Sequence, residues 1–153
     1  MNSPESPGGN DGRVERILGE KVVMIDDELD NIMTLKMLFE KNSCGILQSV
    51  EVVHGMNTDG VFNKAMALEP TVILLDYSMG ANVSAIELLK KFIEHIQTQG
   101  KKIIVIGFSS VDIFNREFLR NGAHGAVLKN GRNLLLMSEI SEIVEKVRKE
   151  EQK

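Results

Sequence analysis

The stretch TVILLDYSMG, residues 71–80, combines the two features from which the fold can be inferred. Four apolar residues, Val72 to Leu75, follow one another directly, and Pro70 stands just before the stretch. A short apolar run bounded by turn formers is typical of a strand that is buried on both faces of a sheet. Asp76 then follows without a spacer. We therefore expect a carboxylate at the carboxyl end of a fully buried strand.

Apolar runs of this kind alternate with amphipathic segments along most of the chain. The predicted strands are residues 21–26, 46–55, 71–76, 101–110 and 124–130. The predicted helices are residues 30–42, 57–70, 85–97, 112–123 and 133–150, and Gly122 is expected to end the fourth of them. Buried strands in strict alternation with helices imply a parallel sheet that is covered on both faces. The sequence therefore predicts one α/β domain with a doubly wound sheet of five strands.

Polar side chains stand at the carboxyl ends of four of the five predicted strands. They are Asp26, Asp27, Asp76, Ser109, Ser110 and Lys129. The carboxyl ends of parallel strands meet at one edge of the sheet, and such sheets bind their ligands there. We therefore expect three carboxylates, a hydroxyl group and an ammonium group to form one site.

The three carboxylates define the chemistry that this site can support. Neighbouring carboxylates repel one another, so a cluster raises at least one pKa or binds a cation. Mg²⁺ prefers carboxylate, carbonyl and water oxygens. A carboxylate can also attack phosphorus and form an acyl phosphate, and Asp76 is the candidate nucleophile. Taken singly, the residues have structural interpretations, because Asp27 or Asp30 could cap the following helix and a lone lysine is usually solvated.

Four motifs in order resemble the receiver domain of two-component response regulators. VVMIDDE (residues 22–28) resembles the acidic pair of that family, and VILLDYSM (residues 72–79) resembles its phosphoacceptor strand. IIVIGFSS (residues 103–110) resembles the strand that ends in the switch serine or threonine, and NGAHGAVLK (residues 121–129) resembles the run that ends in a lysine. The similarity covers residues 20–150. It implies a flavodoxin-like (βα)5 fold with strand order 2-1-3-4-5.

The resemblance also implies a role for each site residue. The implied Mg²⁺ ligands are Asp26, Asp27, Asp76 and the backbone carbonyl of Ser78, with Asp26 acting largely through a metal-bound water. Asp76 would accept a phosphoryl group from a sensor histidine kinase or a histidine phosphotransfer protein. Ser109 and Lys129 would each contact an oxygen of that group.

The same resemblance implies a stand-alone signalling domain that is not an enzyme. It would act through altered protein–protein binding or through onward phosphotransfer. We expect its downstream target to bind the face formed by the fourth helix, the fifth strand and the fifth helix. The family commonly has an aromatic switch residue three positions before the lysine, but Ala126 stands at that position here. Phe108 or Phe114 is the suggested substitute.

Other positions also depart from the family pattern. Gly80 stands where a proline is usual, and Ser84 stands where a glycine is usual. Asn130 replaces the proline that usually follows the lysine. The spacing between Ser109 and Lys129 is shorter than usual, which predicts a trimmed loop after the fourth strand.

Two other functions remain open at this point. The departures favour a phosphorylation-independent pseudo-receiver that acts as a protein interaction module, whereas the complete acidic set opposes it. A phosphatase with an aspartyl nucleophile would need a second aspartate two positions after Asp76 as general acid, and Ser78 stands there.

Composition gives the expected location of the protein. The formal net charge is -4, and we find no basic run that would favour nucleic acid as a direct partner. No apolar run approaches the roughly 18 residues of a membrane span, and the N-terminus has no apolar signal core. With a single cysteine, Cys44, the chain fits a reducing compartment, so a cytoplasmic location is expected. Residues 1–19 are expected to be a flexible extension.

Overall fold

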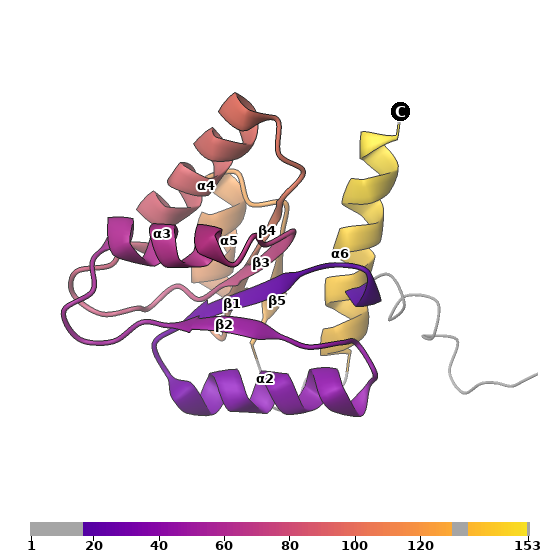
Figure 1. Cartoon of the computed structure of the whole chain (residues 1–153), viewed down its shortest axis with the longest axis horizontal. Helices are drawn as coiled ribbons and strands as arrows, with labels where there is room; N and C mark the ends of the chain where they lie inside the picture. The colour runs from indigo at the N-terminus through magenta and orange to yellow at the C-terminus, as the bar shows by residue number, and fades with distance from the viewer. Residues whose placement is uncertain (1–16, 130–134, 153) are drawn as a thin grey trace, which may run out of the picture.

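The computed structural model describes residues 17–129 and 135–152, which form five strands in strict alternation with helices (Figure 1). The strands are β1 (Val22–Asp26), β2 (Gln48–Glu51), β3 (Val72–Leu75), β4 (Ile104–Ser109) and β5 (Gly125–Leu128). The helices between and after them are α2 (Leu29–Lys41), α3 (Thr58–Ala67), α4 (Ala85–Gln99), α5 (Asp112–Arg120) and α6 (Leu136–Glu151). Residues 1–16 and Asn130 lie outside the described residues, so the expectations for them stay predictions.

All neighbouring strands pair in parallel, and their order in the sheet is β2-β1-β3-β4-β5. The predicted fold class and strand order are therefore confirmed. The order reverses direction at β1, so β1 and β3 lie side by side at the point where open α/β sheets bind ligands.

Helices cover both faces of the sheet (Figure 1). Alternate residues along β1 explain this arrangement, since Val22 and Met24 pack with α2 and α6, while Val23 and Ile25 pack with α3, α4 and α5. Side chains of one strand point to opposite faces in turn. Two separate apolar cores result, and the buried strands have no polar side chain until their carboxyl ends. Among the described helices, none is long and apolar enough to cross a membrane.

Several helix ends are set by identifiable residues. Gly122 has a φ of 105° just after α5, where it ends the helix as predicted. Ser84, at the position where the family usually has glycine, is the N-cap of α4 and accepts a hydrogen bond from the Glu87 N–H at 3.2 Å. The N-cap of α2 is Glu28, so neither Asp27 nor Asp30 has the capping role that remained open for them.

The observed strands are shorter than the apolar runs suggested. The second run was expected to be a strand over residues 46–55, but β2 covers only Gln48–Glu51. As an edge strand, β2 pairs only with β1 in the described sheet, and one more hydrogen bond, from the Val52 N–H to the Asp26 carbonyl at 2.9 Å, follows the last paired residues. The loop after β4 contains only Ser110 and Val111 before α5 begins. The expectation that this loop is shorter than is usual in the family stays a prediction.

Candidate functional site

The carboxyl ends of β1 and β3 bring three aspartates together. Carboxylate oxygens of Asp26, Asp27 and Asp76 all lie within 4.8 Å of one another. Asp26 has no exposed surface and Asp76 is 6% exposed, whereas Asp27 is the more open of the three. Asp26 also accepts a hydrogen bond from the Glu28 N–H at 2.9 Å, which holds its carboxylate over the first turn of α2.

Lys129 joins this cluster from the carboxyl end of β5, the edge strand that is separated from β3 by β4. Its N–H donates to the Ser109 carbonyl at 2.9 Å, which extends the pairing of β4 with β5 beyond the end of β5. Its Nζ then lies 2.9 Å from Asp26 Oδ2 and 2.6 Å from Asp76 Oδ1. One ammonium group is thus shared by two buried carboxylates, and a third carboxylate lies beside them.

The pKa values reflect this excess of negative charge. Burial, with further repulsion from Asp26 and Asp27, raises the pKa of Asp76 to about 6, although Lys129 acts in the opposite direction. Burial and the neighbouring Asp26 also raise the pKa of Asp27. Burial disfavours the charge on Lys129, but its hydrogen bonds to Asp76 and Asp26 outweigh this, so its pKa is raised. A single lysine therefore leaves the cluster short of positive charge.

A cavity of about 340 Å³ opens over these groups. Six of the predicted site residues line this cavity: Asp27, Asp76, Ser78, Ser109, Ser110 and Lys129. Asp26 is not among the lining residues, but it contacts the site through Lys129 Nζ. Glu28, Asn31, Val111 and Phe114 complete the lining. Residues that are far apart in the chain are thus brought to one place, as the parallel sheet predicted.

Ser109 ends β4 and is held by a residue that the sequence analysis did not identify. The Asn115 side chain, on α5, accepts from the Ser109 N–H at 3.1 Å and donates to the Ser109 carbonyl at 3.0 Å. Its Nδ2 also lies 3.2 Å from the Val127 carbonyl. The available signal was an amide three residues before Phe118 in an amphipathic helix, which places it on the buried face.

Aromatic side chains lie beside the site on the α5 side. The Tyr77 ring, directly after Asp76, stacks on Phe114 with ring centres 4.0 Å apart and planes 6° apart. Phe108 lies elsewhere, buried in the core under α2 and α6, with its ring centre 5.8 Å from Lys129 Nζ. Of the two suggested substitutes for the missing aromatic, Phe114 is therefore the one that lines the cavity.

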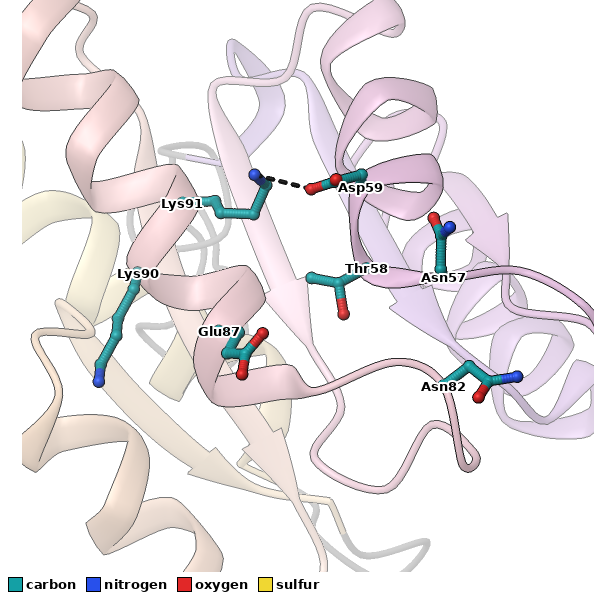
Figure 2. Close-up of a pocket in the computed structure, with 7 residues that line it drawn as sticks. All are labelled: Asn57, Thr58, Asp59, Asn82, Glu87, Lys90 and Lys91. Carbon is teal, nitrogen blue, oxygen red and sulfur yellow. Dashed lines mark ion pairs between the residues drawn. The ribbon is translucent and has the colours of Figure 1, made fainter.

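A larger hollow of about 440 Å³ lies between α3 and α4 (Figure 2). It is lined by Asn57, Thr58, Asp59, Asn82, Glu87, Lys90 and Lys91. Lys91 and Asp59 face each other across it in an ion pair of 2.8 Å, and both side chains are well exposed. Its charges are mutually compensated and solvated, so it does not create the electrostatic conflict seen at the acidic cluster.

Comparisons with known proteins agree with this architecture. No protein-family model and no curated protein matches the chain, but many solved structures do. A DNA-binding response regulator of the LuxR family from Staphylococcus aureus is 19% identical, with a TM-score of 0.56 over 84% of this chain and 98% of that one. The BeF3-activated receiver domain of RstA from Klebsiella pneumoniae is 16% identical, with a TM-score of 0.61 over 81% and 97%. A two-component response regulator from Clostridium difficile is also 16% identical, with a TM-score of 0.60 over 82% and 96%. The chain has the fold of response-regulator receiver domains.

Proposed function

We propose that this chain is a receiver module that accepts a phosphoryl group on Asp76 in a Mg²⁺-dependent reaction. The observation that carries the proposal is the contact of Lys129 Nζ with both Asp26 and Asp76 inside a cluster of three carboxylates. One ammonium group offsets one of three negative charges, so the site retains a surplus that favours a hard divalent cation. The resemblance of the four sequence motifs supports the same function.

The oxygen-rich donor set fits Mg²⁺. Asp26, Asp27, Asp76 and the main-chain carbonyl of Ser78 would hold the ion, with water completing its shell. When bound, the ion supplies positive charge beside the oxygens of the phosphoryl group. The raised pKa values of Asp27 and Asp76 support this assignment, because a cation would relieve the repulsion that raises them.

In the proposed transfer, a carboxylate oxygen of Asp76 attacks phosphorus and forms a new P–O bond. The bond between phosphorus and the donor breaks, and its electron pair leaves with the donor. The leaving group is acetate from acetyl phosphate, or the imidazole of a phosphohistidine, which takes up a proton. Lys129 would then contact one oxygen of the phosphoryl group and Ser109 another. Only the ionised carboxylate is a nucleophile, so a pKa of about 6 for Asp76 favours transfer at neutral over acidic pH.

An exposed apolar stripe on α2 supports a protein as the phosphoryl donor. Leu29, Met33 and Met37 follow one another at four-residue spacing and are 52%, 50% and 66% exposed. Residues at this spacing share one face of a helix. The stripe begins beside Glu28, which lines the cavity, so a bound protein would reach the site. We assign this donor to the class of sensor histidine kinases or histidine phosphotransfer proteins.

The output surface in this proposal is formed by α5, β5 and α6, the fourth helix, fifth strand and fifth helix of the predicted fold. Exposed apolar residues gather on these elements and their connections: Val111, Ile113, Leu119, Leu128 and Leu135. The added phosphoryl group carries about −1.5 to −2 charges and three acceptor oxygens. A shift of Ser109 toward it would be transmitted to this face, changing protein binding or onward phosphotransfer.

The proposed location is the cytoplasm, where such a module would act without enzymatic turnover.

The test of the proposal uses acetyl phosphate as a small donor. Incubation with Mg²⁺ should add the mass of one phosphoryl group to the wild type, and the Asp76→Asn variant should not gain it. A wild type that binds Mg²⁺ but gains no mass would favour the pseudo-receiver instead. Sustained turnover of a generic phosphate ester would favour the phosphatase.

A further inference from the structure

We infer that Asn115 is the positioning residue through which a change at Ser109 reaches helix α5. This inference rests on the proposed function, because it needs a ligand at Asp76 that draws Ser109 toward it. Asn115 lies on α5 and is 7% exposed, and Ser109 is 3% exposed. A buried amide can have a structural role alone, so the inference depends on what the amide joins.

One side-chain amide joins two elements of the output surface, α5 and β5, to the end of β4. Its Oδ1 accepts from the Ser109 N–H at 3.1 Å, and its Nδ2 donates to the Ser109 carbonyl at 3.0 Å and to the Val127 carbonyl at 3.2 Å. The end of β4, the middle of β5 and the first turns of α5 are therefore linked by one group. Leaving a buried amide or peptide group unpaired is costly, so the Ser109 backbone and Asn115 are expected to move together.

The Ser109 hydroxyl is linked to the same helix. Its Oγ accepts a hydrogen bond from the N–H of Val111, the N-cap residue of α5, at 3.1 Å. A hydroxyl group has one hydrogen to donate as well as lone pairs, so Ser109 can donate to an oxygen of the phosphoryl group. Movement toward Asp76 would pull on Val111 and Asn115 together. Both contacts lie at the N-terminal end of α5, one at its N-cap residue and one in its first turn.

A second contact reaches α5 from the phosphoacceptor side. Tyr77 follows Asp76 directly, and its ring stacks on Phe114, the neighbour of Asn115 in the chain. Tyr77 also makes an edge contact with Phe118, one turn further along the helix, with ring centres 5.5 Å apart. Helix α5 is thus held at the consecutive residues Phe114 and Asn115 by the loop after β3 and by the end of β4. In this arrangement Asn115 and the Tyr77–Phe114 pair replace the aromatic residue that the family commonly has at the position of Ala126.

The experiment compares Asn115→Ala with Asn121→Ala. Asn121 is a matched control because its amide bonds within α5, to the Glu117 carbonyl and carboxylate, and does not reach Ser109. Hydrogen exchange of residues 112–120 is measured with and without Mg²⁺ and beryllofluoride, a phosphoryl mimic. Fluorine NMR of the same samples reports whether the mimic is bound. We expect about a fivefold or larger change in protection of α5 in the wild type and in Asn121→Ala, and its loss in Asn115→Ala with the mimic still bound.

Each outcome decides a different statement. If Asn115→Ala binds the mimic and shows the same change in α5 as the wild type, the inference is overturned and the proposed function stands. The same holds if the wild type binds the mimic without any change in α5. If neither beryllofluoride nor acetyl phosphate reacts with the wild type, the proposed function fails and the inference fails with it.

A measurement on the wild type covers the case in which Asn115→Ala does not fold. The side-chain amide NMR signals of Asn115 and Asn121 are followed while Mg²⁺ and beryllofluoride are added. A shift confined to Asn115 supports the inference, because only that amide contacts Ser109. An unchanged Asn115 signal with bound mimic overturns it.

Discussion

Lys129 and Asp76 are 53 residues apart in the chain, yet Nζ of one lies 2.6 Å from Oδ1 of the other. The contact exists because β3 and β5 are parallel strands whose carboxyl ends open on the same edge, with β4 between them. The same Nζ lies 2.9 Å from Asp26, so this lysine is the common partner of two buried acids. Its charge therefore offsets the negative charge of two carboxylates that are buried side by side.

Replacing Lys129 with methionine should destabilise the fold. The variant leaves two buried carboxylates without their ammonium partner, and breaking such a pair costs about 3–5 kcal/mol. Asp76 has a pKa of about 6, so the loss should be smaller near pH 5, where that carboxyl is largely protonated. Urea unfolding at both pH values measures the effect.

Lys91→Met is the control for this variant. Lys91 also forms an ion pair, with Asp59 at 2.8 Å, but both side chains are exposed. Exposed pairs contribute about 0.2–1 kcal/mol, so this variant should change stability little at either pH. Equal losses of unfolding free energy in the two lysine variants would show that the buried ion pairs of Lys129 stabilise the fold no more than the exposed pair of Lys91.

Asp76→Asn should stabilise the metal-free protein at neutral pH. The pKa of Asp76 is raised from 3.8 to about 6, so between these values the folded state binds more protons than the unfolded state. The stability of the wild type consequently falls as the pH rises through this window, and above it the full cost remains. This destabilisation by the ionised Asp76 is a net value that already includes its favourable contact with Lys129. In the variant, Lys129 keeps Asp26 as a partner.

We expect the variant to be about 1–3 kcal/mol more stable at pH 7.5 and equal to the wild type below about pH 4. Unfolding in buffers that contain a chelator, at several pH values, measures the difference. Asp59→Asn is the control, because that side chain is 76% exposed. A variant less stable than the wild type at neutral pH would mean that the Lys129–Asp76 contact outweighs desolvation and repulsion.

Mg²⁺ should bind saturably and stabilise the wild type. A ligand that binds only the folded state adds about 2.7 kcal/mol at a concentration of 100 Kd. The sequence contains one tyrosine and no tryptophan, so fluorescence reports the environment of Tyr77, next to Asp76, alone. We expect a saturable fluorescence change that Asp27→Asn weakens and Asp59→Asn leaves unaltered. Overlapping titrations of the wild type and Asp27→Asn would argue against the acidic cluster as the metal site.

Gly107→Ala should destabilise the packing of α5 on the sheet. A Cβ at this position of β4 would lie 2.8 Å from the Phe118 Cβ and would also collide with the Phe118 ring. Overpacking of this kind costs about 1–3 kcal/mol. At Gly19 an added Cβ meets nothing within 4 Å, so Gly19→Ala serves as the control. Similar midpoints of urea unfolding for the two variants would contradict this close packing.

The sheet and most of the acidic site could be predicted because both depend on local patterns. Asp26 and Asp76 each directly follow apolar residues of a buried strand, and parallel pairing alone brings such positions to one edge. Lys129 was found by the same reasoning, helped by the family resemblance. Ser84 was noted only as a departure, and its role as the N-cap of α4 required the structure.

Asn115 could not be predicted in this way. Its spacing from Phe118 indicates the buried face of the helix, but its two bonds to Ser109 depend on how α5 packs against the end of β4. The stack of Tyr77 on Phe114 is likewise a tertiary contact between a loop and a helix. The extent of β2 was overestimated because apolar β-branched residues continue past the point where its only described neighbour, β1, can pair with it.

The most direct test of the central claim locates the phosphoryl group at a residue. The protein is incubated with acetyl phosphate and Mg²⁺, any acyl phosphate is reduced with borohydride, which converts aspartyl phosphate to homoserine, and peptides are analysed by mass spectrometry. We expect homoserine at position 76, dependent on Mg²⁺, and much less of it in Lys129→Met. Homoserine at another aspartate, or none at position 76 under conditions in which Mg²⁺ binds, would contradict the claim.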